Sequence, residues 1–311
     1  MRILLQFPEG LKAKALEIAT RLEKKGDTVF LSASPCYGAC DLALHQAEMV
    51  KADKIIHYGH AEFPLKGKPE IPVEFVEYPS HVDFKTVLEK VLADSDFRRC
   101  KKVGLITTVQ HVGQLGKIKK FLEAKGKTVL IGKHGPLAAY DGQVLGCDVG
   151  SAISVDEKVD CILYFGGGRF HPIAAAIACN QRVICADPFL GKAFWLDEEK
   201  QKYLKRRKGL LSLGLQAKRF GILVSTKPGQ FNLAAAEALK KKLKGLGKQA
   251  EILVADRIEP EALENFHSFD FFIETACPRI AVDDYAQFGK PILSLADAGE
   301  LVSLLKEMEK A

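Results

Sequence analysis

The sequence lacks several features that would assign it to a familiar class of protein. It has no apolar run near the roughly 20 residues that cross a membrane. Its first residues, MRILLQFPEGLKAK, read as a strand and a turn, without the apolar core and cleavage site of a secretory signal. We therefore expect a cytoplasmic protein with no membrane association.

Charge of one sign is not in strong excess, because 45 Lys and Arg stand against 39 Asp and Glu, a net charge of +6. The basic stretches 204–208 and 240–248 contain few aromatic residues, so the stacking platform of a single-strand binder is missing. We interpret both as solvated helix faces and expect no direct nucleic-acid partner. With 47% hydrophobic and 27% charged residues, the 311-residue chain has an ordinary globular composition and room for two or three domains.

No two of the eight cysteines form a CxxC pair, and the CxxxCxxC pattern is also missing. These absences argue against a zinc ribbon, a thioredoxin motif, the usual ferredoxin run and an ordinary radical S-adenosylmethionine enzyme. Cys161, Cys179 and Cys185 lie in apolar patterns and are predicted to be core residues, and Cys100 has no assigned role. The other cysteines lie in turn-like loops, CYGACD (36–41), LGCDVG (145–150) and TACPRI (275–280).

The sequence does contain a threefold alternation of strands and helices. Strands are expected at 3–7, 102–108 and 219–226, each followed by a polar turn, a helix and a further strand. The remaining expected strands are 28–33, 54–59, 73–78, 128–133, 161–166, 182–187, 250–256, 269–275 and 291–295. The three segments therefore look like repeats of one unit. The alternative to such a repeat is the general strand–helix–strand similarity that any α/β protein shows.

The spacing of this pattern favours an α/β fold of three similar Rossmann-like domains with parallel sheets. We expect a pseudo-threefold arrangement of these domains around a central cluster site. Their expected bounds are 1–98, 99–196 and 197–311, with a charged helical segment over 193–217 between the second and third.

Each expected domain carries at least one cysteine in a loop that follows a strand. Cys40 and Cys147 follow second strands, whereas Cys277 follows a third strand. Ligands bind beyond the carboxyl ends of parallel strands, so the three thiols are candidates for one metal centre. Structural zinc usually has four protein ligands, whereas three thiolates suit a 4Fe-4S cluster with one open iron. The alternative is three unconnected loop cysteines.

Seven motifs together resemble the archaeal diphthamide synthase family. They are QFPEGL (6–11), YGACD (37–41), HYGHA (57–61), GQVLGC (142–147), GGGRFHP (166–172), STKPGQ (225–230) and ACPRIAVDDY (276–285). The resemblance implies a transferase, namely a radical S-adenosylmethionine enzyme of an unusual type that forms a homodimer of three-domain subunits. It implies transfer of the 3-amino-3-carboxypropyl group of S-adenosylmethionine to imidazole C2 of a histidine in translation elongation factor 2, the first step of diphthamide biosynthesis.

The resemblance also implies that Cys40, Cys147 and Cys277 hold a 4Fe-4S cluster and that an external electron donor reduces it. A radical route suits the chemistry, because imidazole C2 is a poor nucleophile and a polar transfer would favour nitrogen. Cys36 lies outside this ligand set, and we interpret it as a packing residue. A spare ligand and a damage-prone thiol are its alternatives.

Two residues near the third cysteine are candidates for binding the methionine end of S-adenosylmethionine. Arg279 offers a guanidinium fork for the carboxylate, with a surface salt bridge as the alternative. Gln230 is expected to reach the same end of the ligand.

Another group of candidates lies in the motif GGGRFHP. Gly167 and Gly168 would let the backbone approach the nucleotide closely. His171 is expected to line the same pocket, or else to belong to a helix start with Pro172 at its first position. His57 and His60 are either pocket residues or locally hydrogen-bonded.

Two other functions remain open from the sequence. One is a nonradical nucleotide-dependent transferase in which the cysteines are incidental. The other is a noncatalytic iron–sulfur electron-transfer partner of such a transferase. Because all three ligand motifs occur in this one chain, we favour the self-sufficient enzyme.

Overall fold

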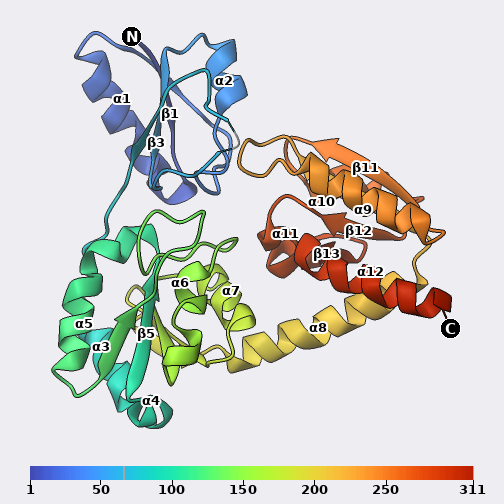
Figure 1. Cartoon of the computed structure of the whole chain (residues 1–311). Helices are drawn as coiled ribbons and strands as arrows, with labels where there is room; N and C mark the ends of the chain where they lie inside the picture. The colour runs from blue at the N-terminus through green and yellow to red at the C-terminus, as the bar shows by residue number, and fades with distance from the viewer. Residues whose placement is uncertain (66, 311) are drawn as a thin grey trace. The chain divides into compact units, whose positions relative to one another are not determined.

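The computed structural model describes residues 1–65 and 67–310, which form three sheets of mostly parallel strands covered by helices (Figure 1). These residues group into two compact units, Met1–Asp197 and Glu198–Ala311. The first unit contains two of the sheets and the second unit contains the third. The predicted α/β class with three similar parallel sheets is thereby confirmed.

The first sheet has the strand order β2-β1-β3-β4, with all strands parallel. Its strands are β1 (Arg2–Gln6), β2 (Thr28–Leu31), β3 (Lys54–Tyr58) and β4 (Val73–Val76). Helices α1 (Ala15–Glu23) and α2 (Leu44–Met49) lie on opposite faces of this sheet (Figure 1), and the 3-10 helix η1 (Glu9–Lys14) precedes α1. Because side chains alternate along a strand, Ile3 and Leu5 pack toward α1 while Leu4 packs toward α2.

The second sheet has the order β6-β5-β7-β8-β9. Its strands are β5 (Lys102–Thr107), β6 (Thr128–Ile131), β7 (Cys161–Phe165), β8 (Val183–Asp187) and β9 (Lys192–Trp195). One face is covered by α3 (Lys85–Ala93) and α5 (Leu115–Glu123), and the other by α6 (Gly150–Ile153) and α7 (Phe170–Ala178) (Figure 1). The shorter helices are α4 (Ser95–Arg99), η2 (Val109–Gln114) and η3 (Asp156–Lys158).

Strand β9 corrects the expectation of a helical segment that begins at residue 193. It pairs antiparallel with β8, and the following helix α8 begins at Asp197. Trp195 packs toward one face of the sheet and Phe194 toward the other, which is the side-chain alternation of a strand, and both are partly buried. The guanidinium of Arg182 lies 4.1 Å from the centre of the Trp195 ring and helps to hold the strand in place.

The third sheet has the order β11-β10-β12-β13, again all parallel. Its strands are β10 (Arg219–Ser225), β11 (Gln249–Ala255), β12 (Phe271–Glu274) and β13 (Ile292–Ser294). Residues of α8 (Asp197–Gln216), α9 (Leu233–Gly245) and α12 (Leu295–Lys310) pack on one face. The other face carries α10 (Pro260–Glu264) and α11 (Pro278–Val282), and η4 (Asp284–Gln287) follows α11.

The same strand order recurs in all three sheets, since the opening strand always lies between the second and third strands along the chain.

The predicted core cysteines Cys161, Cys179 and Cys185 are each at most 2% exposed, so that prediction is confirmed. Among the described residues, no helix is both long enough and apolar enough to cross a bilayer. A domain boundary at residues 98–99, inside the first compact unit, stays a prediction.

Candidate functional site

Two of the three predicted cluster cysteines lie close together in the first compact unit. Cys40 lies in the loop after β2, and Cys147 lies in the loop after β6. The surrounding protein and, to a lesser degree, the neighbouring Cys40 thiol raise the pKa of Cys147 to about 12, although the residue as a whole is exposed. The fold therefore brings together thiols that are far apart in the sequence.

The Cys147 loop is anchored to the carboxyl end of β5. The backbone N–H of Thr107 donates to the carbonyl of Gly142 at 2.7 Å, and the N–H of Val144 donates to the carbonyl of Thr107 at 2.8 Å. Gly146 lies so close to Phe170 that a Cβ atom there would be 1.8 Å from the aromatic ring. This tight approach fixes the backbone directly before Cys147.

Asp148 organises the same loop, and the sequence reasoning did not single it out. Its carboxylate accepts hydrogen bonds from the backbone N–H groups of Leu137 at 2.7 Å, Ala138 at 3.2 Å and Gly150 at 2.8 Å. The side chain is buried, so these three bonds replace its contacts with water. The signal in the sequence was an Asp two residues before a Gly. This spacing is typical of a turn in which the Asp side chain accepts a hydrogen bond from the backbone N–H two residues later.

The Cys40 loop is anchored by Gln6, the last residue of β1. The side-chain Nε2 of Gln6 donates to the carbonyl of Asp41 at 2.6 Å, and its Oε1 accepts from the N–H of Ala43 at 3.1 Å. A Cβ atom on Gly38 would lie 3.4 Å from the Cys40 sulfur. The Gln6 amide thus positions the backbone directly after Cys40.

Cys277 lies in the second compact unit, in the loop after β12 and at the start of α11. The buried Glu274 side chain accepts hydrogen bonds from the N–H groups of Ala276 at 3.0 Å and Cys277 at 2.9 Å. Burial raises the pKa of Glu274 to about 7, even though both hydrogen bonds favour the ionised form. Glu274 therefore fixes the backbone at Cys277. That Cys277 shares one cluster site with Cys40 and Cys147 stays a prediction.

The candidates for the methionine end of S-adenosylmethionine also lie in the second unit. Arg279 in α11 has its Nε 3.4 Å from a carboxylate oxygen of Asp284, so the surface ion pair considered as the alternative is present. Gln230 lies in the turn after β10, where its backbone N–H donates to the carbonyl of Lys227 at 2.9 Å. Their roles toward a ligand stay predictions.

The nucleotide-pocket candidates lie after β7 in the first unit. The hydroxyl of Tyr164 donates to the carbonyl of Gly167 at 3.2 Å, and Gly168 has a φ of +78°, which favours glycine. Helix α7 begins at Phe170, so Pro172 is its third residue and not its first. His171 is the second residue of that helix, and its ring packs against Phe170 with ring centres 5.4 Å apart.

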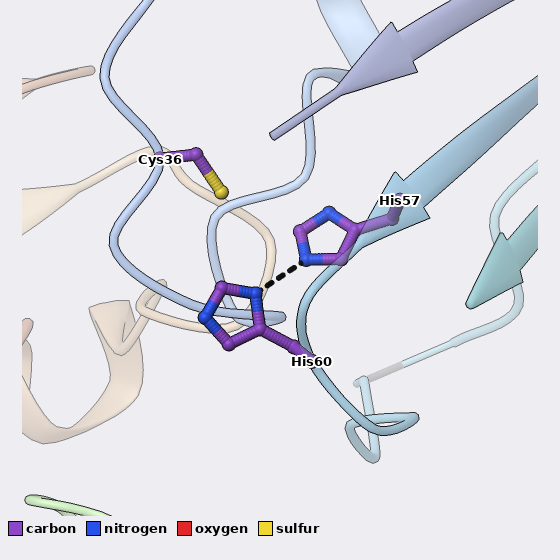
Figure 2. Close-up of side chains that lie close together, drawn as sticks. All are labelled: Cys36, His57 and His60. Carbon is purple, nitrogen blue, oxygen red and sulfur yellow. Dashed lines mark hydrogen bonds between the residues drawn. The ribbon is translucent and has the colours of Figure 1, made fainter. Parts of the chain in front are cut away.

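Two histidines of HYGHA meet the buried Cys36, as Figure 2 shows. The ligand atoms of Cys36, His57 and His60 all lie within 4.8 Å of one another. His57 Nε2 is 2.9 Å from His60 Nδ1, and His57 Nδ1 is 3.0 Å from Gln6 Oε1. Burial lowers the pKa of His57 to about 3, with a smaller contribution from His60, and burial lowers the pKa of His60 to about 4. The local hydrogen bonding considered for both histidines is therefore present.

Three mostly parallel sheets that share one strand order, with cysteines in loops that follow their strands, define an α/β protein of three Rossmann-like sheets with a thiol-bearing site. The family model for diphthamide synthesis proteins matches residues 7–310, and the chain belongs to this family.

The chain is similar over most of its length to curated members of the family. It is 36% identical over 310 residues to the 2-(3-amino-3-carboxypropyl)histidine synthase of Pyrococcus horikoshii. This match covers 99% of this chain and 87% of that protein. It is 30% identical to the protein of the same name from Methanocaldococcus jannaschii, over 94% of this chain and 81% of that protein.

A solved structure shows the same fold. The crystal structure of Dph2 from Pyrococcus horikoshii with 4Fe-4S cluster superposes with a TM-score of 0.89 at 34% identity. The match covers 97% of this chain and 86% of that one.

Proposed function

We propose that this chain is a 2-(3-amino-3-carboxypropyl)histidine synthase. It would transfer the 3-amino-3-carboxypropyl group of S-adenosylmethionine to imidazole C2 of a histidine in translation elongation factor 2. The observation that carries the proposal is the likeness, over 99% of this chain, to the Pyrococcus horikoshii synthase of that name. We further propose that the enzyme works in the cytoplasm as a homodimer with an external electron donor.

The donor set fits a 4Fe-4S cluster held by Cys40, Cys147 and Cys277. Cysteine thiolates are the usual protein ligands of such clusters, and three of them leave one iron open. The Cys40 thiol is near enough to help raise the pKa of Cys147, which supports a shared site for these two. When bound, the cluster supplies the electron that allows the bond between sulfur and the methionine γ-carbon to break.

The side chains of this chain would bind and orient the co-substrate. Arg279 and Gln230 are proposed to hold the methionine end, with Arg279 exchanging its ion pair with Asp284 for the carboxylate of the ligand. Gly167, Gly168 and His171 are proposed to line the nucleotide pocket. Their joint task is positional, because the γ-carbon must face the reducing centre if the aminocarboxypropyl group is to be released.

The test uses the purified full chain, reconstituted with iron and sulfide without oxygen. With dithionite and S-adenosylmethionine, we expect methylthioadenosine and the transfer of the aminocarboxypropyl group to elongation factor 2, both measured by mass spectrometry. Elongation factor 2 without the acceptor histidine is the control and should remain unmodified.

Two results would contradict the proposal. Activity that persists in air without iron would indicate a nonradical transferase. A protein that carries a cluster but forms methylthioadenosine only with a second, different chain would indicate an electron-transfer partner.

A further inference from the structure

We infer that Cys36, His57 and His60 form a second metal site, distinct from the proposed cluster ligands, that binds one divalent ion of the zinc type. The three side chains come from the loop after β2, the end of β3 and the turn that follows it (Figure 2). Their ligand atoms lie within 4.8 Å of one another. One thiolate and two imidazoles are a ligand set that suits zinc, and they leave a fourth position for water.

The orientation of His57 is set by a residue behind it. Gln6 donates through Nε2 to the carbonyl of Asp41 and accepts through Oε1 from the N–H of Ala43, which fixes the direction of its amide. Gln6 Oε1 can therefore only accept from His57 Nδ1, which lies 3.0 Å away. The proton of His57 is thus on Nδ1, and the lone pair of Nε2 points toward His60. Metal-binding histidines are commonly oriented by such a bond from the second ring nitrogen to an oxygen.

The distance between the two histidine nitrogens is close to the distance between two nitrogens that bind the same zinc ion. His57 Nε2 and His60 Nδ1 are 2.9 Å apart, and this contact is a hydrogen bond. In a tetrahedral zinc site with Zn–N bonds of about 2.0–2.1 Å, two nitrogens lie about 3.3 Å apart. A shift of a few tenths of an ångström therefore brings these two nitrogens to the spacing of a zinc site, and the Cys36 sulfur, within 4.8 Å of both, must approach them to complete it. The proton on His60 Nδ1 moves to its Nε2, the thiol of Cys36 releases its proton to solvent, and zinc is bound without oxidation or reduction.

Two of the three ligand residues are almost fully buried. Cys36 is 3% exposed, and His57 is 0% exposed. Because Cys36 lies four residues before Cys40, a bound ion would tie the Cys40 loop to β3. This inference does not depend on the proposed transferase activity, because none of its ligands belongs to the proposed cluster set.

The test measures zinc apart from iron. A full-length variant with Cys40, Cys147 and Cys277 all replaced by Ala removes the proposed cluster ligands and leaves the second site intact. After treatment with a chelator, we expect this variant to bind one equivalent of Zn²⁺, measured by metal analysis and calorimetry. The substitutions Cys36→Ser, His57→Gln and His60→Gln, made in the same background, should each weaken binding at least about 100-fold. His45→Gln, at an exposed histidine of α2, is the matched control and should not change the affinity.

Cobalt provides a measurement that needs no substitution at the site. Co²⁺ added to the metal-free triple variant should give the intense visible bands of tetrahedral cobalt and a thiolate-to-cobalt charge-transfer band. The absence of stoichiometric binding, or cobalt bound with no thiolate band, would overturn the inference. Zinc affinity that is unchanged in all three ligand variants would overturn it as well. A further measurement uses the single variant Cys36→Ser, with Cys40, Cys147 and Cys277 intact. If this variant loses iron after reconstitution but still binds zinc, Cys36 belongs to the iron site and the inference is refuted.

Discussion

The amide of Gln6 on β1 accepts a hydrogen bond from the imidazole of His57 on the neighbouring strand β3, at 3.0 Å. The two residues are paired in the parallel register of the sheet, and both are almost fully buried. The same amide holds Asp41 and Ala43, which follow Cys40 in the chain. One buried side chain therefore connects the core of the first sheet to the loop that carries a proposed cluster ligand.

Replacing Gln6 by Leu should lower the free energy of unfolding by roughly 3 kcal/mol, because buried hydrogen-bonding groups of His57, Asp41 and Ala43 lose their partner. Urea unfolding followed by circular dichroism measures the change. Gln46→Leu is the control, because the Gln46 amide donates to Ser34 at an exposed position. If the free energy of unfolding falls equally in Gln6→Leu and Gln46→Leu, the role assigned to Gln6 is contradicted.

Replacing Asp148 by Ala should destabilise the first compact unit by about 2 kcal/mol or more. The substitution leaves the N–H groups of Leu137, Ala138 and Gly150 without their acceptor in a partly buried loop. Hydrogen exchange should show faster exchange of these three amides than in the wild type. If their protection is retained, Asp148 does not organise the loop.

Replacing Gly146 by Ala should cost about 1–3 kcal/mol, because the new Cβ would lie 1.8 Å from the Phe170 ring and the ring would have to move. The matched control is Gly116→Ala in α5, where no atom lies within 4 Å of the added carbon. The control should be neutral or stabilise the protein by up to about 1 kcal/mol, because alanine favours helix. Thermal unfolding of both variants measures the difference, which should exceed 1 kcal/mol.

Replacing Cys40, Cys147 or Cys277 by Ala should abolish both the brown colour of the anaerobically reconstituted protein and methylthioadenosine formation. The physical reason is that a cluster with three protein ligands loses one of its anchors in each variant. Absorption spectra, iron and sulfide counts and electron paramagnetic resonance provide the measurement. Cys36→Ala should retain both properties, and loss of the cluster there would refute the ligand assignment.

The stability of the protein should fall as the pH drops below about 6.5, in part through His111. Burial lowers the pKa of His111, whose ring packs edge-on against Phe165 with ring centres 5.2 Å apart. The unfolded chain therefore binds a proton at a pH where the folded chain does not, and acid favours the unfolded state. The stabilising difference is complete above the unfolded pKa of about 6.5 and is lost as the pH falls toward the lower folded pKa.

His111→Asn should flatten this pH dependence below pH 6.5 by at most about 1.4 kcal/mol per pH unit, which is the contribution of one proton. Urea unfolding at a series of pH values measures the slope. His45→Asn, at an exposed position of α2, is the control and should leave the slope as it is in the wild type. An unchanged slope in His111→Asn would show that this ring does not titrate differently in the folded and unfolded chains.

The sequence determined the class of fold because continuous apolar strands alternate with amphipathic helices, as buried parallel sheets require. It also determined that Cys161, Cys179 and Cys185 are core residues, since all three lie inside apolar patterns. It did not reveal β9, because Lys192–Trp195 is a short run directly before a charged helix. Only the pairing of this run with β8 identifies it as a strand.

The electrostatic interaction of Cys40 with Cys147, and the meeting of Cys36 with His57 and His60, were decided by the tertiary structure. Residues at the ends of parallel strands become neighbours only when the strand order and register are set, and a shift of one residue would turn each side chain to the opposite face. The register that pairs Gln6 with His57 is fixed by the packing of both faces of the first sheet. Local sequence cannot specify that packing, because it depends on helices and strands tens of residues away.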